Sequence, residues 1–537
     1  MRNILLLVGP LLFVHVAAGQ SPSLHRVSPL AVPAGKTTEV KLVGERLGEI
    51  TDLWCSAANV RLVPTNDTRL IITTPTNGAG VIALRVAGTN GVSDVAMLLI
   101  DAMPSIQESA TNKAVTNAQF LHRPVAVDGT TDELAFDFYS FDGKRGETVS
   151  IEVLASRIGS KLDPVLRILD EEKHELAFCE DAPGAGRDCR VQFRAPKNAK
   201  YVIEVRDIAY SGGAQHFYRL RVGKFAFPTC TYPLAAAPGS EISVLGPLGE
   251  RFSPAKLKLV TAVPSYVPLS GSFVPVRSDD LPSQHFEREP NDRREEANPV
   301  SLPHVINGRF EKAKDRDCFQ IDVNKDERWI FATRSRSFGS PCDVFLELRD
   351  AEDKTVAESN PSGPQDTTLT HEFKKAGRYW LIAKELADRG APDFAYQIDA
   401  KLFEPAFTMA VDDDKIEAKP GGEFNIAVSC SRSEFNDKIA VELEGLPEGF
   451  TIENANIESK KTNATLKVKV PENAQPGELL AFRVVGRAGE KRAVASTISA
   501  LRRNFITMLY PPAELDGVVA LGITAGDPAP KGKRKRS

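Results

Sequence analysis

A short acidic stretch in the second half of the chain carries the side chains best suited to chemistry. Glu287, Glu289, Asn291 and Asp292 fall within one segment of six residues. Three carboxylates and an amide supply several of the six to eight oxygen ligands that Ca²⁺ takes. The spacing therefore predicts a calcium site wrapped by one extended segment. The alternative is a solvated acidic linker, neutralised by the arginines between residues 288 and 294.

The sequence signatures of common enzymes are absent. The chain has no Gly-x-Ser-x-Gly, His-Glu-x-x-His, Cys-x-x-Cys or glycine-rich phosphate loop, and its eight His are scattered singly. Small β-modules account for every segment, so no stretch of hydrolase-domain length is left over. We therefore expect no catalytic residues and no peptidase activity, with an unrecognised hydrolase as the alternative.

The overall charge is balanced. Lys plus Arg number 67 and Asp plus Glu 71, which gives a net charge of −4. Such a surface gives no reason to expect nucleic acid as a partner. The last residues, 527–537, are basic and contain proline. We expect a disordered tail there, either solvated or in electrostatic contact with an anionic cell envelope.

The N-terminus has the pattern of a cleavable signal peptide. Arg2 precedes an apolar run over 4–18, and Ala17 and Gly19 supply the small residues at a cleavage site before Gln20. The run is shorter than the ~20 residues of a membrane span, although an N-terminal anchor is the alternative. We expect a signal peptide at 1–19 and a secreted, periplasmic or cell-envelope protein.

Seven cysteines are an odd number, so at least one thiol is free or pairs between chains. Cys179 and Cys189 bracket a short loop rich in Gly and Asp. A disulfide between them would staple a hairpin. The isolated cysteines fit small buried apolar side chains instead.

Internal repeats set the domain organisation. Residues 156–170 match 335–350, at an offset of 180 from Gly159 and Gly339 onward, and residues 137–141 match 317–321 at the same offset. A second, shorter repeat relates 29–44 to 233–246, with a fainter echo at 419–428. The strand patterns alternate apolar and polar residues, and turn residues recur about every ten positions. The sequence therefore predicts an all-β chain of tandem β-sandwich domains.

The longer repeat resembles the bacterial pre-peptidase C-terminal (PPC) domain, a small jelly-roll β-sandwich. The resemblance rests on residues 287–292, Gly308, 317–319, 162–166 and 377–379. The first module is similar to an IPT/TIG-type immunoglobulin-like domain and the last to a bacterial Ig-like domain. The alternation of modules resembles large exported proteins of planctomycete-like bacteria.

This resemblance implies how the calcium shell is completed. In calcium-binding members, a Glu-x-Glu-x-Asn-Asp stretch wraps the ion, and acids before an Asp-aromatic strand add ligands. Here those acids are Asp315 and Asp317, one residue closer together than the usual Asp-x-x-Asp. The first copy keeps only Glu108 and Asn112, so we expect calcium in the second copy alone.

Together these patterns predict six segments after the signal peptide. They are an Ig-like domain (22–102), a first PPC-like sandwich (105–223), a short connecting Ig-like module (224–280), a second PPC-like sandwich (286–402), an Ig-like sandwich (404–500) and a tail (501–537). We expect an exported, non-catalytic protein that binds or presents extracellular protein or polysaccharide. The alternatives are a structural cell-envelope protein or an accessory subunit of a secreted peptidase. The pattern leaves the oligomeric state open.

Overall fold

The computed structural model describes residues 20–528, apart from short gaps at 49, 58–60, 67, 77, 250–251, 253–255, 259–264, 270–271 and 279–282. The predicted signal peptide and residues 529–537 of the predicted tail lie outside these residues. Strands dominate the described chain, which confirms the expected all-β sandwich fold. Among the described helices, none has the length and apolar character needed to cross a membrane.

The first Ig-like module packs two sheets face to face. One sheet has the order β1 (Ser23–Ser28), β3 (Thr37–Glu45), β6 (Arg69–Thr73), β5 (Arg61–Asn66). The other has the order β2 (Ala31–Val32), β9 (Ala96–Ile100), β7 (Gly80–Gly88), β4 (Asp52–Cys55), with β8 (Gly91–Val92) beside β7. Val40 and Leu42 alternate with exposed neighbours along β3 and enter the core, as the period of two requires.

The first PPC-like module is a sandwich of two five-stranded sheets. One sheet runs β10 (Ser105–Gln107), β12 (Val125–Thr130), β19 (Phe217–Gly223), β14 (Thr148–Leu154), β17 (Cys189–Arg194). The other runs β11 (Gln119–Phe120), β13 (Asp137–Gly143), β18 (Ala199–Asp207), β15 (Pro164–Leu169), β16 (Glu175–Cys179). Short 3-10 turns at η1 (Val115–Asn117) and η2 (Ser156–Ile158) connect strands.

The second PPC-like module repeats this strand order. Its sheets run β26 (Gln284–Phe286), β28 (His304–Arg309), β35 (Ala395–Leu402), β30 (Arg328–Arg334), β33 (Thr368–Glu372), and β27 (Asn298–Val300), β29 (Arg316–Val323), β34 (Gly377–Glu385), β31 (Val344–Arg349), β32 (Thr355–Glu358). η3 (Arg294–Glu296) and η4 (Arg336–Phe338) match η1 and η2. In both copies the first strand pairs parallel to the third. The internal repeat seen in the sequence is therefore a repeat of structure.

A small connecting module lies between the PPC-like modules. It has two three-stranded sheets, β20 (Cys230–Tyr232), β22 (Glu241–Leu245), β23 (Lys256–Lys258), and β21 (Ala235–Ala236), β25 (Ser272–Ser278), β24 (Ser265–Leu269).

The last module extends beyond its predicted end at residue 500. Its strands are β36 (Ala406–Val411), β37 (Lys415–Ala418), β38 (Glu423–Ser433), β39 (Ile439–Glu444), β40 (Thr451–Glu453), β41 (Asn456–Ile457), β42 (Asn463–Lys469), β43 (Leu479–Ala488), β44 (Lys491–Ser496) and β45 (Val519–Ile523). β45 pairs with β37 and β43. Much of the predicted tail is thus ordered, through α1 (Ile498–Asn504), η5 (Ala513–Leu515) and β45. Pro511 and Pro512 interrupt this apolar stretch, which hides its structured parts in the sequence.

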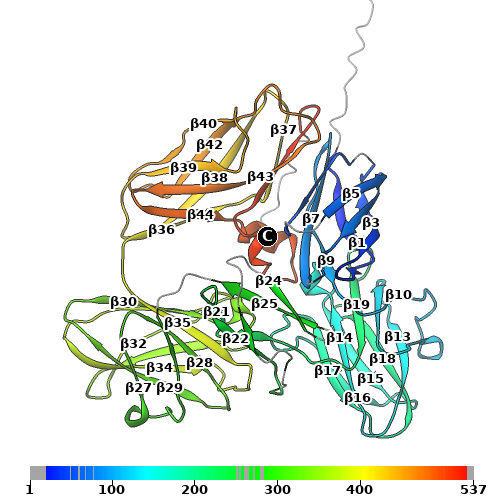
Figure 1. Ribbon diagram of the computed structural model, residues 1–537, viewed down its shortest axis with the longest axis horizontal. Coiled ribbons are helices and arrows are strands. Elements are labelled where there is room, and N and C mark those ends of the chain that lie inside the picture. The colour runs from blue at the N-terminus through cyan, green and yellow to red at the C-terminus, as the bar shows by residue number, and fades with distance from the viewer. Residues whose placement is uncertain are drawn as a thin grey trace, which may run out of the picture.

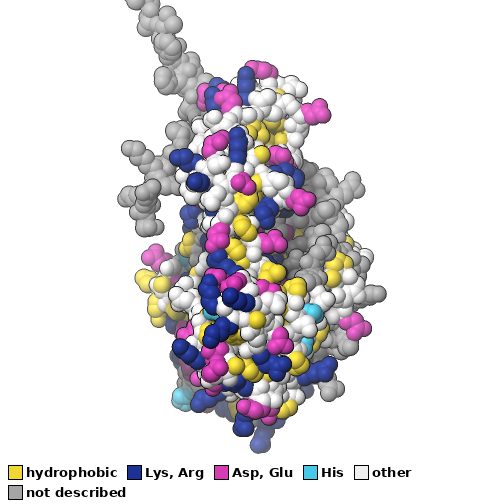
Figure 2. Space-filling view, turned by 90° about the vertical axis from the view of Figure 1, so that its left-hand side faces the viewer, with side chains coloured by type: hydrophobic (Ala, Val, Ile, Leu, Met, Phe, Trp, Pro, Cys, Tyr) yellow, Lys and Arg dark blue, Asp and Glu magenta, His cyan; other side chains and the backbone are white. Residues whose placement is uncertain are grey.

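The modules close on one another instead of forming an open string. The first and last modules lie side by side, with the connecting module and the C-terminal segment at the centre (Figure 1). Between the first and last modules, Arg85 and Asp414 form a buried ion pair, and the Asp52 carboxylate accepts the N–H of Leu479 at 2.9 Å. Figure 2 shows acidic and basic side chains interspersed over one side of the molecule, in keeping with the balanced composition.

Candidate metal centre

The predicted calcium stretch is held between the two sheets of the second PPC-like module. It follows β26 and precedes η3. The N–H of Glu287 donates to the carbonyl of Asn307 at 3.0 Å, which ties the start of the stretch to β28. The carbonyl of Asn291 accepts the N–H of Cys318 at 3.0 Å, which ties its end to β29. The segment is therefore anchored at both ends and passes over the start of β29.

Three of the predicted ligands converge. One carboxylate oxygen from each of Glu289, Asp315 and Asp317 lies within 4.8 Å of the others. Asp315 is 2% exposed, and Asp317 and Asn291 are 0% exposed. Asp317 Oδ1 and both side-chain amide atoms of Asn291 have no hydrogen-bond partner, and Asp315 Oδ1 has none besides an ion-pair contact with Lys312 Nζ at 3.4 Å. Unpaired buried polar atoms are costly, so this donor set fits a bound cation.

Glu287 joins the group through a tyrosine. Its Oε1 accepts the N–H of Arg309 at 2.6 Å. The Tyr396 hydroxyl donates to Asp317 Oδ2 at 2.5 Å, and the oxygen of this hydroxyl lies 3.4 Å from Glu287 Oε2. Sequence reasoning missed Tyr396 as part of the site, although Tyr218 matches it in the first copy.

The electrostatics of the site favour a cation. Burial raises the pKa of Glu287 to about 8, and it raises the pKa of Asp317 well above its usual range, with the charge of Glu287 adding to the effect. Burial and the neighbouring Asp315 also raise the pKa of Glu289. Buried acids that repel one another are stabilised when a divalent cation neutralises them.

Asp292 does not join the convergent carboxylates. Its Oδ2 binds the Lys312 ammonium at 2.9 Å, and this lysine holds the pKa of Asp292 below its usual range. The same ammonium is 3.4 Å from Asp315 Oδ1. Arg294, one of the expected neutralising arginines, instead stacks on Trp380 at 3.8 Å and pairs with Asp353. Arg294 therefore does not neutralise the stretch, and Lys312 neutralises Asp292 instead.

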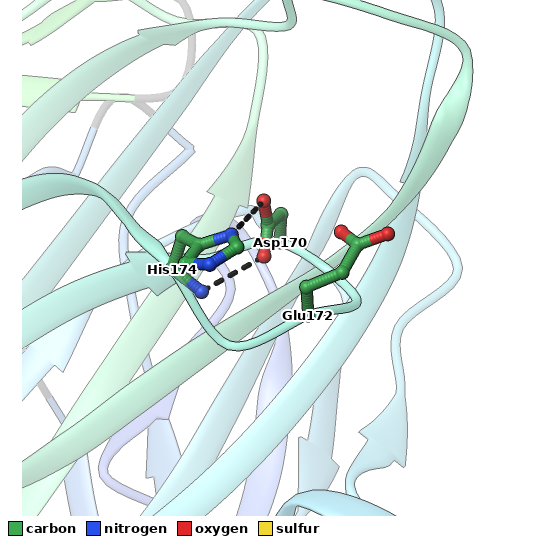
Figure 3. A group of neighbouring side chains, drawn as sticks. All are labelled: Asp170, Glu172 and His174. Atoms are coloured by element: carbon green, nitrogen blue, oxygen red, sulfur yellow. Dashed lines mark hydrogen bonds and ion pairs between the residues drawn. The ribbon is translucent and has the colours of Figure 1, made fainter.

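A second acidic group, which the sequence analysis did not single out, belongs to a hairpin turn (Figure 3). Asp170 accepts the backbone N–H of His174 at 2.8 Å and lies 3.2 Å from its Nδ1, and one Glu172 carboxylate oxygen lies within 4.8 Å of an Asp170 oxygen and a His174 ring nitrogen. In the second copy Asp350 accepts the N–H of Lys354 at 2.9 Å. The turn forms equally well without histidine, so we assign it no metal.

Cys179 and Cys189 lie together, at the end of β16 and the start of β17. Cys189 Sγ is 3.1 Å from the Cys179 carbonyl, and Cys179 Sγ accepts the N–H of Arg190 at 3.4 Å. Both are free thiols in this structure. Their mutual hydrogen bond lowers the pKa of Cys179 to about 7 and raises that of Cys189.

No protein-family model and no curated protein matches the chain. Among solved structures, the pre-peptidase C-terminal domain of a collagenase from Bacillus anthracis is 20% identical and covers 21% of this chain and all of its own, with a TM-score of 0.17. The four N-terminal Ig domains of Dscam1 isoform 8.4 are 8% identical and cover 94% of this chain and 98% of their own, with a TM-score of 0.15.

The surface layer protein SbsC, domains 1–6, is 10% identical and covers 95% of this chain and 55% of its own, at a TM-score of 0.15. At these identities and TM-scores, the neighbours carry no conclusion about function. The all-β assignment rests on the strands described above.

Proposed function

We propose that the chain is an exported, non-catalytic multidomain protein whose modules bind or present extracellular protein or polysaccharide. A structural Ca²⁺ in the second PPC-like module is part of this proposal. The observation that carries the calcium site is the pair of buried oxygens without hydrogen bonds on Asp317 and Asn291, beside the buried Asp315, whose Oδ1 lies 3.4 Å from Lys312 Nζ. β-Sandwich domains bind their ligands mainly through loops, and the packing of the five modules fixes the relative positions of the sandwiches that carry those loops.

Within this site the residues have distinct roles. Glu289, Asp315 and Asp317 supply the converging carboxylates. Asn291 adds an amide oxygen from the same buried segment, and Glu287 is linked to Asp317 through Tyr396. Bound Ca²⁺ would neutralise these acids and fasten the entry segment to β29. Extracellular calcium modules bind with dissociation constants of ~10⁻⁴–10⁻³ M, and a 100-fold excess of ion would add about 2.7 kcal/mol of stability.

We expect one saturable Ca²⁺ site when the full mature chain is titrated by calorimetry. Asp317→Asn combined with Glu289→Gln should abolish the binding heat and the calcium-dependent rise in melting temperature. Glu172→Gln, in the hairpin turn, is the matched control and should bind as the unaltered chain does. No binding heat and no shift in melting temperature would contradict the calcium site.

Binding to an extracellular partner has its own test. The mature chain, with calcium, is mixed with insoluble polysaccharides or with immobilised extracellular protein. The amount of chain that sediments with each polymer is compared with the amount that sediments by self-assembly when no polymer is present. Saturable retention on one of these polymers supports the proposal. Assembly of the chain by itself, without retention, would favour a structural envelope protein.

We also infer that Cys179 and Cys189 form a disulfide once the chain is exported. Their sulfurs would join, and two protons and two electrons would pass to an oxidant such as dioxygen or a protein disulfide. The bond would link β16 and β17, the edge strands of the two sheets. Peptide mapping without reduction should recover the two residues linked, with Cys55 still alkylated. Recovery of both as alkylated thiols would contradict the inference.

A further inference from the structure

The first PPC-like module holds a lysine where the second has its acidic stretch. Backbone contacts set the correspondence: Glu108 matches Glu287, and Lys113 matches Asp292. In both copies the glutamate N–H donates to the neighbouring strand, at 3.1 and 3.0 Å. In both, the asparagine before Lys113 or Asp292 accepts an N–H from the other sheet, at 2.8 and 3.0 Å.

The Lys113 ammonium lies among the acids of the first module. Its Nζ is 2.7 Å from Glu108 Oε1 and is also paired with Asp137 Oδ1. Asp137 is the counterpart of Asp317, and it accepts the hydroxyl of Tyr218 at 2.8 Å as Asp317 accepts that of Tyr396. The lysine head group thus joins the two carboxylates whose counterparts face the candidate calcium site.

The other two acids of the site are missing from the first copy. Ala110 stands in place of Glu289 and Ala135 in place of Asp315. Glu108, Asp137 and Lys113 sum to a net charge of −1, and the exposed Asp132 lies 3.9 Å from the same ammonium. The second copy gathers four carboxylates, and Lys312, 3.4 Å from Asp315, reduces their charge only to −3. One monovalent cation suits the first set, and the second set needs more positive charge. Although burial lowers the pKa of Lys113, its bonds to Asp137 and Glu108 outweigh this and keep it charged.

We propose that Lys113 is the built-in cation of the first PPC-like module and replaces there the Ca²⁺ of the second. The entry segment of the first module is then held against its sandwich with or without calcium, and calcium affects the second module alone. This second half of the inference rests on the proposed calcium site, while the role of Lys113 in the first module does not.

The calcium-dependent module adjoins the connecting module through the same entry strand. Phe286, the last residue of β26, has its ring 5.8 Å from that of Tyr232 in β20. The Arg309 guanidinium lies 5.1 Å from the centre of the Tyr232 ring, and Tyr232 donates its hydroxyl to the Asn307 carbonyl at 3.3 Å. Removing calcium should therefore loosen this junction and leave the first module unaffected.

Hydrogen exchange on the full mature chain tests both halves. With a calcium chelator, we expect faster exchange over 284–297 and unchanged exchange over 105–118. Lys113→Met should raise exchange over 105–118 about tenfold or more with or without calcium, since charge-assisted hydrogen bonds are lost. Lys113→Arg should restore most of the protection. The exposed Lys144→Met is the matched control and should change nothing.

A gain of site gives a second readout. The triple variant Ala110→Glu, Lys113→Asp, Ala135→Asp should bind two calcium ions per chain instead of one. The lysine role is overturned if Lys113→Met leaves exchange over 105–118 unchanged. If the unaltered chain binds no calcium, the proposed site fails, and the Lys113 variants still decide the first half. A chelator effect of equal size in both copies would overturn the division between them.

Discussion

Replacing Glu152 with glutamine is expected to destabilise the first PPC-like module by about 3–5 kcal/mol. Glu152 is buried on β14 and pairs with three guanidinium groups. The distances are 2.7 Å to Arg157, 2.9 Å to Arg190 and 2.7 Å to Arg221. Glutamine keeps the shape but removes the one carboxylate that all three arginines share. Arg157 keeps its pair with Asp188 and Arg221 its contact with Asp101, so the large effect comes mainly from the buried Arg190, whose carboxylate partner among the described residues is Glu152.

The arginine cluster also joins modules. Arg190 donates to the carbonyl of Pro228 at 3.2 Å, and Arg221 stacks on Phe225 at 4.7 Å, both in the chain that leads into the connecting module. Arg221 lies 3.5 Å from Asp101, at the end of the first Ig-like module. The second copy has Ala332 at the position of Glu152. The ionic cluster therefore serves the contacts of the first copy and is not a property of the repeated fold.

Denaturant unfolding measures the Glu152 effect, and its pH dependence has a defined sign. Burial alone would raise the pKa of Glu152, but the three arginines outweigh it and hold the pKa well below its usual range. A lowered folded-state pKa contributes stability above the unfolded value, near 4.3, and that stability is lost as the pH falls. The difference between Glu152→Gln and the unaltered chain should accordingly shrink in strong acid.

The exposed pair of Glu175 and Arg167, 2.7 Å apart, provides the control. Glu175→Gln should cost no more than about 1 kcal/mol, because solvent screens such pairs. Equal costs for Glu175→Gln and Glu152→Gln would show that charge compensation inside the cluster is not what holds the module together.

Features that depend on residues close together in the sequence could be predicted. Period-two strands identified the sandwiches, and the offset of 180 between copies identified the repeated module. The convergence of Glu289 with Asp315 and Asp317 followed from the resemblance, because the motif and the Asp-aromatic strand keep their places in it. Asp292 was the exception. The Lys312 that binds it lies 20 residues away in the chain, and nothing in the local pattern indicates that contact.

Contacts between distant segments could not be predicted in this way. In the sequence, Lys113 shows only that an acid of the motif has been replaced. Its pairing with Asp137 depends on how β13 lies against the entry segment, which the local pattern does not give. Arg85 and Asp414 are 329 residues apart. β45 is a five-residue strand whose partners, β37 and β43, lie earlier in the chain, so only the assembled sheet distinguishes it from a tail.

The C-terminal segment fills the space between three modules. Leu501 and Phe505 pack with Leu30 of the first Ig-like module and with Leu154 and Phe217 of the first PPC-like module. Thr507 holds the segment to a loop of the first PPC-like module. Its hydroxyl donates to the Ser160 carbonyl at 2.6 Å, and its own carbonyl accepts the Ser156 hydroxyl at 2.7 Å. The segment therefore acts as a shared core for units that would otherwise be separate.

Phe505→Ala is expected to cost about 3–5 kcal/mol and to divide thermal unfolding into separate module transitions. Phe505 is 4% exposed, whereas the adjacent Ile506 is 60% exposed. Ile506→Ala is thus the matched control and should change stability by no more than about 0.5 kcal/mol. Calorimetry gives the transitions, and limited proteolysis should cut the Phe505 variant first at module boundaries. If both variants unfold alike, the segment only covers the modules, and their union depends on direct contacts such as Arg85 with Asp414.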